Sequence, residues 1–152
     1  MKIRINYVSN SSSSSFIIWG DNAFDYINCI EDGYAINIDD AFYYIWNKRI
    51  TKSYYRSTEC TFISDDEWKE KFDNGYDVIY TLPISIQAEA YYSNNIDDYK
   101  KVFYNWFYEN YKNEQFYFID FSDHPDETKY HENDMYDVMC DYSGKGFSFF
   151  NH

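Results

Sequence analysis

The sequence predicts an α+β protein in which about four helices pack on one face of a mainly antiparallel sheet. Two observations lead to this prediction. Segments with helical periodicity alternate irregularly with short strand-like runs, and the regular strand–helix–strand spacing of a parallel sheet is missing. The length of 152 residues suits one domain, and the sequence has neither an internal repeat nor a long linker. We therefore expect residues 1–152 to form a single domain.

Two strands joined by a polar loop are expected at the N-terminus. Apolar and polar residues alternate over residues 2–7, which is the period of a strand. A short apolar run at residues 16–19, closed by Gly20, predicts a second strand. The serine-rich run at residues 9–15 has turn character, so we expect a loop between the two strands.

Helical periodicity follows in two places. Residues 21–30 predict a short helix, which Gly33 should end. Residues 38–50 predict a clearer helix, because its acidic residues stand in the first turn and its basic residues in the last, as the helix dipole favours.

The middle of the chain carries the strongest local signal. Ser64 and Glu67 have the spacing of a capping box, which predicts a helix over residues 65–74. Residues 77–86 then alternate as a strand. Pro83 cannot donate to a strand ladder, so this strand should lie at an edge or contain a bulge.

The C-terminal third should contain the longest helix and two strands. Residues 95–112 predict that helix, with Asn95 as its cap and a broad aromatic face. The nearly all-aromatic residues 116–121 predict a buried strand. After a polar stretch, a short helix is expected at residues 134–140, and a last strand at residues 147–150 follows a glycine-containing turn.

Aromatic residues are unusually abundant, with 19 Tyr, 13 Phe and 4 Trp. So many tyrosines should leave several at the surface, where the rigid, amphipathic ring is a good binding group. The composition of an AT-rich genome would give the same bias, and both explanations remain open.

The charge is strongly negative, at −13 overall. Residues 1–60 carry seven acidic and six basic residues, whereas residues 61–152 carry nineteen and seven, so the two parts have net charges of −1 and −12. Direct binding to a nucleic-acid backbone or to an anionic membrane is not expected, because both need clustered Lys and Arg. This charge suits a basic partner protein instead.

Other features indicate a cytoplasmic binding protein. The three cysteines form no C-x-x-C pair, which fits free thiols in a reducing compartment. We see neither a signal peptide nor an apolar window long enough to span a membrane. Because the sequence lacks phosphate-loop, metal-binding and nucleophile motifs, we expect no cofactor and favour a binding protein over an enzyme.

A dense acidic segment with a single base, Lys129, lies near the C-terminus. Its eight acids are Asp120, Asp123, Asp126, Glu127, Glu132, Asp134, Asp137 and Asp141. Held rigidly, these carboxylates could imitate a nucleic-acid backbone and occupy a basic channel. A solvated acidic surface, a carboxylate pair for acid–base catalysis, and a metal site using His124, His131 and Glu132 are the alternatives, although no ligand spacing matches a known metal site.

The serine run belongs to a recognisable opening. Residues 8–17 read V-S-N-S-S-S-S-S-F-I, which resembles the start of many uncharacterised phage and bacterial proteins. The resemblance implies a phage or mobile-element origin and no particular activity. The run itself is a candidate loop for contact with a ligand or partner, although it lacks the phosphate-loop pattern and would serve equally as a solvated connection or an address read by a partner; its residues are Ser9, Asn10, Ser11, Ser12, Ser13, Ser14 and Ser15.

Together these patterns predict a phage-type acidic protein that binds and inhibits a host protein in the cytoplasm of an infected or phage-carrying bacterium. The expected target is a basic, nucleic-acid-binding defence protein such as a CRISPR effector or a nuclease. One alternative is a small nucleotide-binding or metal-dependent enzyme that uses the serine run with His131 and Glu132. A virion or assembly component is another.

Overall fold

The computed structural model describes residues 13–28, 30, 33–50, 61–76, 78, 81–86, 95–121 and 142–151. Four strands form an antiparallel sheet in the order β2-β5-β1-β6, namely β1 (Ser13–Trp19), β2 (Gly33–Ile36), β5 (Phe116–Phe121) and β6 (Lys145–Asn151). The helical elements are α2 (Ala23–Asn28), α3 (Ile38–Ile45), the π-helical turn η1 (Trp46–Ile50), α5 (Asp65–Asp73) and α7 (Ile96–Tyr111). The predicted α+β class is therefore confirmed.

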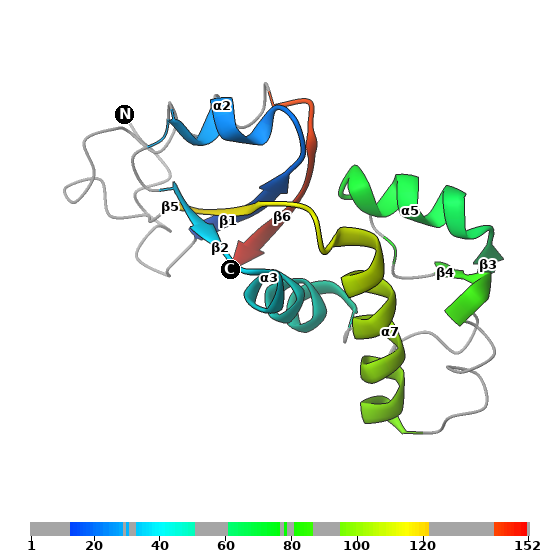
Figure 1. The fold of residues 1–152 in the computed structure, drawn as a ribbon. Helices are drawn as coiled ribbons and strands as arrows, with labels where there is room; N and C mark the ends of the chain where they lie inside the picture. The colour runs from blue at the N-terminus through cyan, green and yellow to red at the C-terminus, as the bar shows by residue number, and fades with distance from the viewer. Residues whose placement is uncertain are drawn as a thin grey trace, which may run out of the picture.

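Helices cover both faces of this sheet, as Figure 1 shows, whereas helices on one face were predicted. Along β1, Ile17 and Trp19 lie in the larger core with residues of α3, η1, α5 and α7. Ile18 lies in the smaller core, against α2. A strand whose successive side chains enter two cores reads as a continuous apolar run, which is how residues 16–19 appear in the sequence.

Trp19 lies at the centre of the larger core and is fully buried. Four rings surround its indole with centroids 5.3–6.2 Å away, those of Phe72, Tyr111, Phe116 and Phe147. Such stacked, tilted and edge-on ring contacts stabilise the core beyond the area that each ring buries. Much of the aromatic surplus is thus core, while several tyrosines remain at the surface as predicted.

The predicted helix at residues 65–74 is confirmed as α5 and is fixed at both ends. The Ser64 hydroxyl accepts a hydrogen bond from the backbone N–H of Glu67 at 3.2 Å. At the other end, Gly75 has φ of +69°, and a Cβ there would stand 2.3 Å from the carbonyl oxygen of Gly146. Only glycine allows both the left-handed backbone and this close approach of α5 to β6.

The long C-terminal helix and the aromatic strand are also confirmed. The predicted helix at residues 95–112 is α7 with its caps, and the Asn95 side chain accepts from the N–H of Asp97. Residues 116–121 form β5, which lies between β2 and β1. The last strand begins at Lys145, earlier than predicted.

Two N-terminal expectations were wrong. Ser13–Ser15 belong to β1 instead of a loop, because β6 pairs with all three serines and β5 pairs with the last two. The buried Ser15 hydroxyl donates to Oδ1 of Asp120, its partner in β5, at 3.1 Å. Gly33 does not end a helix but opens β2, a strand that the sequence did not reveal.

The middle strand was predicted too long. Among the described residues of this segment, Thr81–Pro83 alone is a strand, β4, and it pairs in parallel with β3 (Thr61–Ile63). The chain turns helical after Pro83, and Ile84 is 55% exposed. The expected strand at residues 2–7 and helix at residues 134–140 lie outside the described residues. In the part of the chain that the structure describes, no helix is long and apolar enough to cross a bilayer.

Replacing Gly33 by alanine should loosen α2 from the sheet. The added Cβ would stand 2.1 Å from Cδ1 and 3.0 Å from Cγ1 of Ile27, so this side chain would have to leave its packed position between α2 and the sheet. We expect the free energy of unfolding, measured in urea, to fall by about 1–3 kcal/mol. Ile27→Val removes the clashing methyl and should recover most of this loss in the double variant; an unchanged loss would contradict the contact.

Candidate functional site

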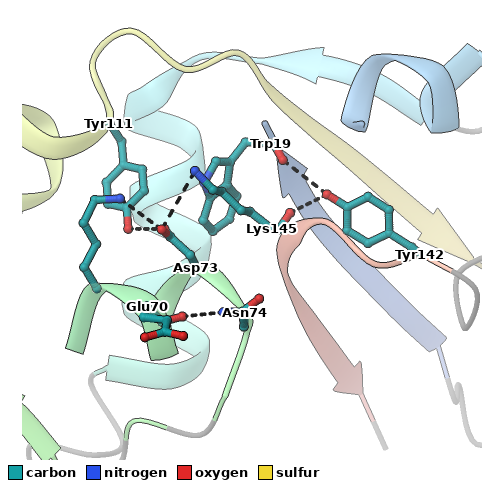
Figure 2. A network of polar contacts seen from close by, with 8 residues as sticks. Trp19, Glu70, Asp73, Asn74, Tyr111, Tyr142 and Lys145 are labelled. Atoms are coloured by element: carbon teal, nitrogen blue, oxygen red, sulfur yellow. Dashed lines mark hydrogen bonds and ion pairs between the residues drawn. The ribbon is translucent and has the colours of Figure 1, made fainter. Parts of the chain in front are cut away.

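A buried carboxylate joins three elements of the larger core. Figure 2 shows Asp73 of α5 between the hydroxyl of Tyr111 and the ammonium of Lys145. The Tyr111 hydroxyl donates to Oδ1 of Asp73 at 2.5 Å. Nζ of Lys69 lies 3.0 Å from Oδ2 of Asp73, and Nζ of Lys145 lies 4.0 Å from the same oxygen. This network therefore ties α5 to α7 and to β6.

The contacts of this network stabilise the fold. Burial, and next the hydrogen bond to Asp73, raise the pKa of Tyr111 far above its ordinary range, so its hydroxyl stays a donor at every physiological pH. The open depression beside it, of about 300 Å³, is lined by both lysines and three carboxylates. The buried Asp73 already has both lysines and Tyr111 as partners, so we assign the network to stability.

The outward surface of α3 carries alternating tyrosines and carboxylates. Ala41, Phe42 and Ile45 face the core. At 100° per residue, the opposite arc of the helix is occupied in turn by Asp39, Tyr43, Asp40 and Tyr44. Tyr43 is 58% exposed, and both aspartates are exposed. This arc runs from the flank next to α7 to the flank next to the sheet.

The sheet continues this surface on one side. The ring of Tyr34 in β2 packs on Phe118 at 5.6 Å, and Tyr44 stacks on the same ring at 4.8 Å. Burial first, then the neighbouring Tyr44 and the negative charges of Asp120 and Asp40, raise the pKa of Tyr34. Tyr34 thus lies within the electrostatic reach of carboxylates from β5 and α3.

Helix α7 continues the surface on the other side. The Tyr104 hydroxyl donates to Oδ1 of Asp39 at 2.5 Å. The ring of Tyr108 stacks beside that of Tyr104, with centroids 6.2 Å apart. The hydrogen bond to Asp39 is the main reason that the pKa of Tyr104 is raised. Tyr104 and Asp39 therefore form a fixed pair across the contact between α7 and α3.

These groups make one surface, which we call the tyrosine–carboxylate face. Its members are Tyr34, Asp39, Asp40, Tyr43, Tyr44, Tyr104, Tyr108 and Asp120. Three of the tyrosines are well exposed, Tyr34 at 53%, Tyr43 at 58% and Tyr108 at 41%. On α7, the basic residue nearest in sequence to Tyr104 is Lys101, about one helical turn before it. Rigid aromatic rings among negative charges suit contact with a positively charged protein surface.

Only part of the predicted site lies in the described part of the chain. Asp120 is exposed at one end of the tyrosine–carboxylate face. Three sets lie outside the described residues: the other acids of the segment (Asp123, Asp126, Glu127, Glu132, Asp134, Asp137 and Asp141), the candidate metal ligands (His124, His131 and Glu132), and the first half of the serine run (Ser9, Asn10, Ser11 and Ser12). Among the residues that the structure describes, no group of three or more His, Cys, Asp or Glu could hold a metal ion.

Sequence reasoning missed most of this face. Asp39 and Asp40 were explained by the helix dipole alone, although their spacing to Tyr43 and Tyr44 already places all four outside the apolar stripe. The contributions of β2 and α7 depend on tertiary packing, which no local pattern encodes. Searches of protein-family models, of curated proteins and of solved structures found no match to this chain.

Proposed function

We propose that the protein is a non-enzymatic inhibitor that docks its tyrosine–carboxylate face on a basic surface of a partner protein. One observation supports this above all. Exposed tyrosines and carboxylates from β2, α3, β5 and α7, far apart in the sequence, lie on one side of the fold. The aromatic rings supply rigid anchors, and the carboxylates supply attraction to positive charge.

The overall charge favours a nucleic-acid-binding target. A net charge of −13 steers the protein toward positive surfaces and away from nucleic acid itself. The basic channel of a nuclease or CRISPR effector is such a surface, and its blockage would inhibit the enzyme. The phage-like opening of the sequence supports a host defence protein as the target.

The proposal can be tested with the immobilised protein and bacterial lysate. We expect capture of one basic nucleic-acid-binding protein in stoichiometric amount. With the purified partner, affinity should fall steeply between about 50 and 200 mM salt, and DNA or RNA should compete for binding. An affinity that changes neither with salt concentration nor with added nucleic acid would contradict docking by charge complementarity.

Tyr43→Ala should weaken binding to this partner by at least about tenfold, as expected for an exposed aromatic anchor. The ring is 58% exposed, so its removal should leave the melting temperature nearly unchanged. Tyr76, 61% exposed after α5 and outside the face, provides the matched control. Isothermal titration calorimetry with the captured partner measures both variants, and equal losses for Tyr43→Ala and Tyr76→Ala would refute the assignment of the face.

A further inference from the structure

Helix α7 carries two tyrosines that make the same hydrogen bond. Tyr111 donates to Oδ1 of Asp73, and Tyr104 donates to Oδ1 of Asp39, both at 2.5 Å. The two tyrosines are seven residues apart, about two helical turns. One pair is buried and the other is at the surface. The same chemical unit is thus built twice along one helix.

The buried pair binds a cation of its own chain. Nζ of Lys69 lies 3.0 Å from Oδ2 of Asp73 and 4.8 Å from the centroid of the Tyr111 ring. The hydroxyl holds the carboxylate in place through one oxygen, and the other oxygen receives the ammonium. The ring face adds a cation–π contact. A tyrosine–aspartate pair of this kind is therefore a cation-binding unit in this fold.

The surface pair presents the same groups toward solvent. Asp39 is exposed, its Oδ1 accepts the Tyr104 hydroxyl, and the ring of Tyr108 stacks beside Tyr104. Within the described ranges, neither Lys nor Arg forms an ion pair with Asp39. The cation that completes the buried unit thus has no counterpart at the surface unit in this part of the chain.

We infer that the pair of Tyr104 and Asp39 is a receptor for one cationic side chain, a lysine or an arginine, of the partner protein. Oδ2 of Asp39 receives the ammonium or guanidinium group, and the rings of Tyr104 and Tyr108 supply the aromatic surface beside it. This inference rests on the proposed function, since it names the contact through which the tyrosine–carboxylate face binds a basic partner.

Capped fluorescent hexalysine and hexaarginine peptides serve as probes, with binding followed by fluorescence anisotropy at low salt. Asp39→Asn should weaken binding of at least one peptide about fivefold, and Tyr104→Phe about twofold. Because the hydroxyl acts only through the carboxylate, Tyr104→Phe should add nothing in the Asp39→Asn background. The peptide that shows the larger loss identifies the preferred cation.

Asp66→Asn is the matched control, because Asp66 is also an exposed aspartate in the first turn of a helix, α5, and the charge change is the same. It should change peptide affinity less than 1.5-fold, roughly the effect of one distant screened charge. Equal losses for Asp66→Asn and Asp39→Asn would show that only net charge matters and would overturn the receptor. The receptor would also be overturned if Tyr104→Phe weakened peptide binding as much in the Asp39→Asn background as in the wild-type protein.

The captured partner separates this inference from the proposed function. If Tyr43→Ala abolishes capture while Asp39→Asn binds with full affinity, the receptor is wrong and the docking face stands. If neither substitution affects capture, the face itself is wrong. Thermal melting of each variant shows whether the fold is intact, and the isosteric Asp39→Asn change is expected to preserve it.

Discussion

Substituting Trp19 by alanine is expected to lower the free energy of unfolding by about 4 kcal/mol, the largest effect of any single change that we consider. The side chain is fully buried, and four rings from α5, α7, β5 and β6 surround it. These elements cannot collapse into the space because each is also held by its own partners. Urea denaturation followed by far-UV circular dichroism measures the change.

Trp19→Phe is the informative control. Among the described residues, Nε1 of Trp19 is buried without a hydrogen-bond partner. Phenylalanine removes this unsatisfied donor while keeping a ring in the cluster, so we expect a loss of no more than about 2 kcal/mol. Equal losses for the two variants would mean that the indole does not lie in the packed centre.

Asp73→Ala should cost about 3 kcal/mol in the same measurement. The change leaves the buried Tyr111 hydroxyl without its acceptor, and it removes the counter-ion of Lys69 and Lys145. Both lysines are partly exposed and can turn to water, so the orphaned hydroxyl dominates the cost. Asp66→Ala, on the exposed surface of the same helix, should stay within about 0.5 kcal/mol of wild type.

Alkaline pH gives an independent test of the same network. Burial raises the pKa of Tyr111 above its ordinary value of about 10, so only the unfolded chain releases this proton just above pH 10. The stabilisation is therefore complete below pH 10 and declines as the pH rises above it. Well above pH 10, Tyr111→Phe should make the fall of the unfolding free energy with rising pH shallower, by up to about 1.4 kcal/mol per pH unit. An unchanged slope would contradict the buried hydroxyl.

The helices were predictable because their signals are local. The capping box at Ser64, the cap at Asn95 and the acidic first turns each specify a boundary within a few residues of chain. Pairing partners are not specified in this way. No local pattern near Gly33 predicts β2, because that strand is short and forms by pairing with Phe116–Ile119, eighty or more residues later.

The candidate site was likewise predictable only where composition or local pattern determines it. The acidic character of the surface and the availability of tyrosine for binding could be read from composition. That Tyr104 would reach Asp39 could not, because the two residues are 65 positions apart and meet only when α7 packs against α3. The prediction placed the binding charge within residues 120–141, of which Asp120 lies on the face that the structure describes.

The position of β1 has a consequence during synthesis. This N-terminal strand pairs on both sides with strands that start at Phe116 and Lys145, and β2 also depends on β5. No rung of the four-stranded sheet can therefore form until the chain has been synthesised as far as Phe116. Until then Ile17, Ile18 and Trp19 lack their strand partners on the nascent chain, which makes early translation the stage most exposed to aggregation and to chaperone capture.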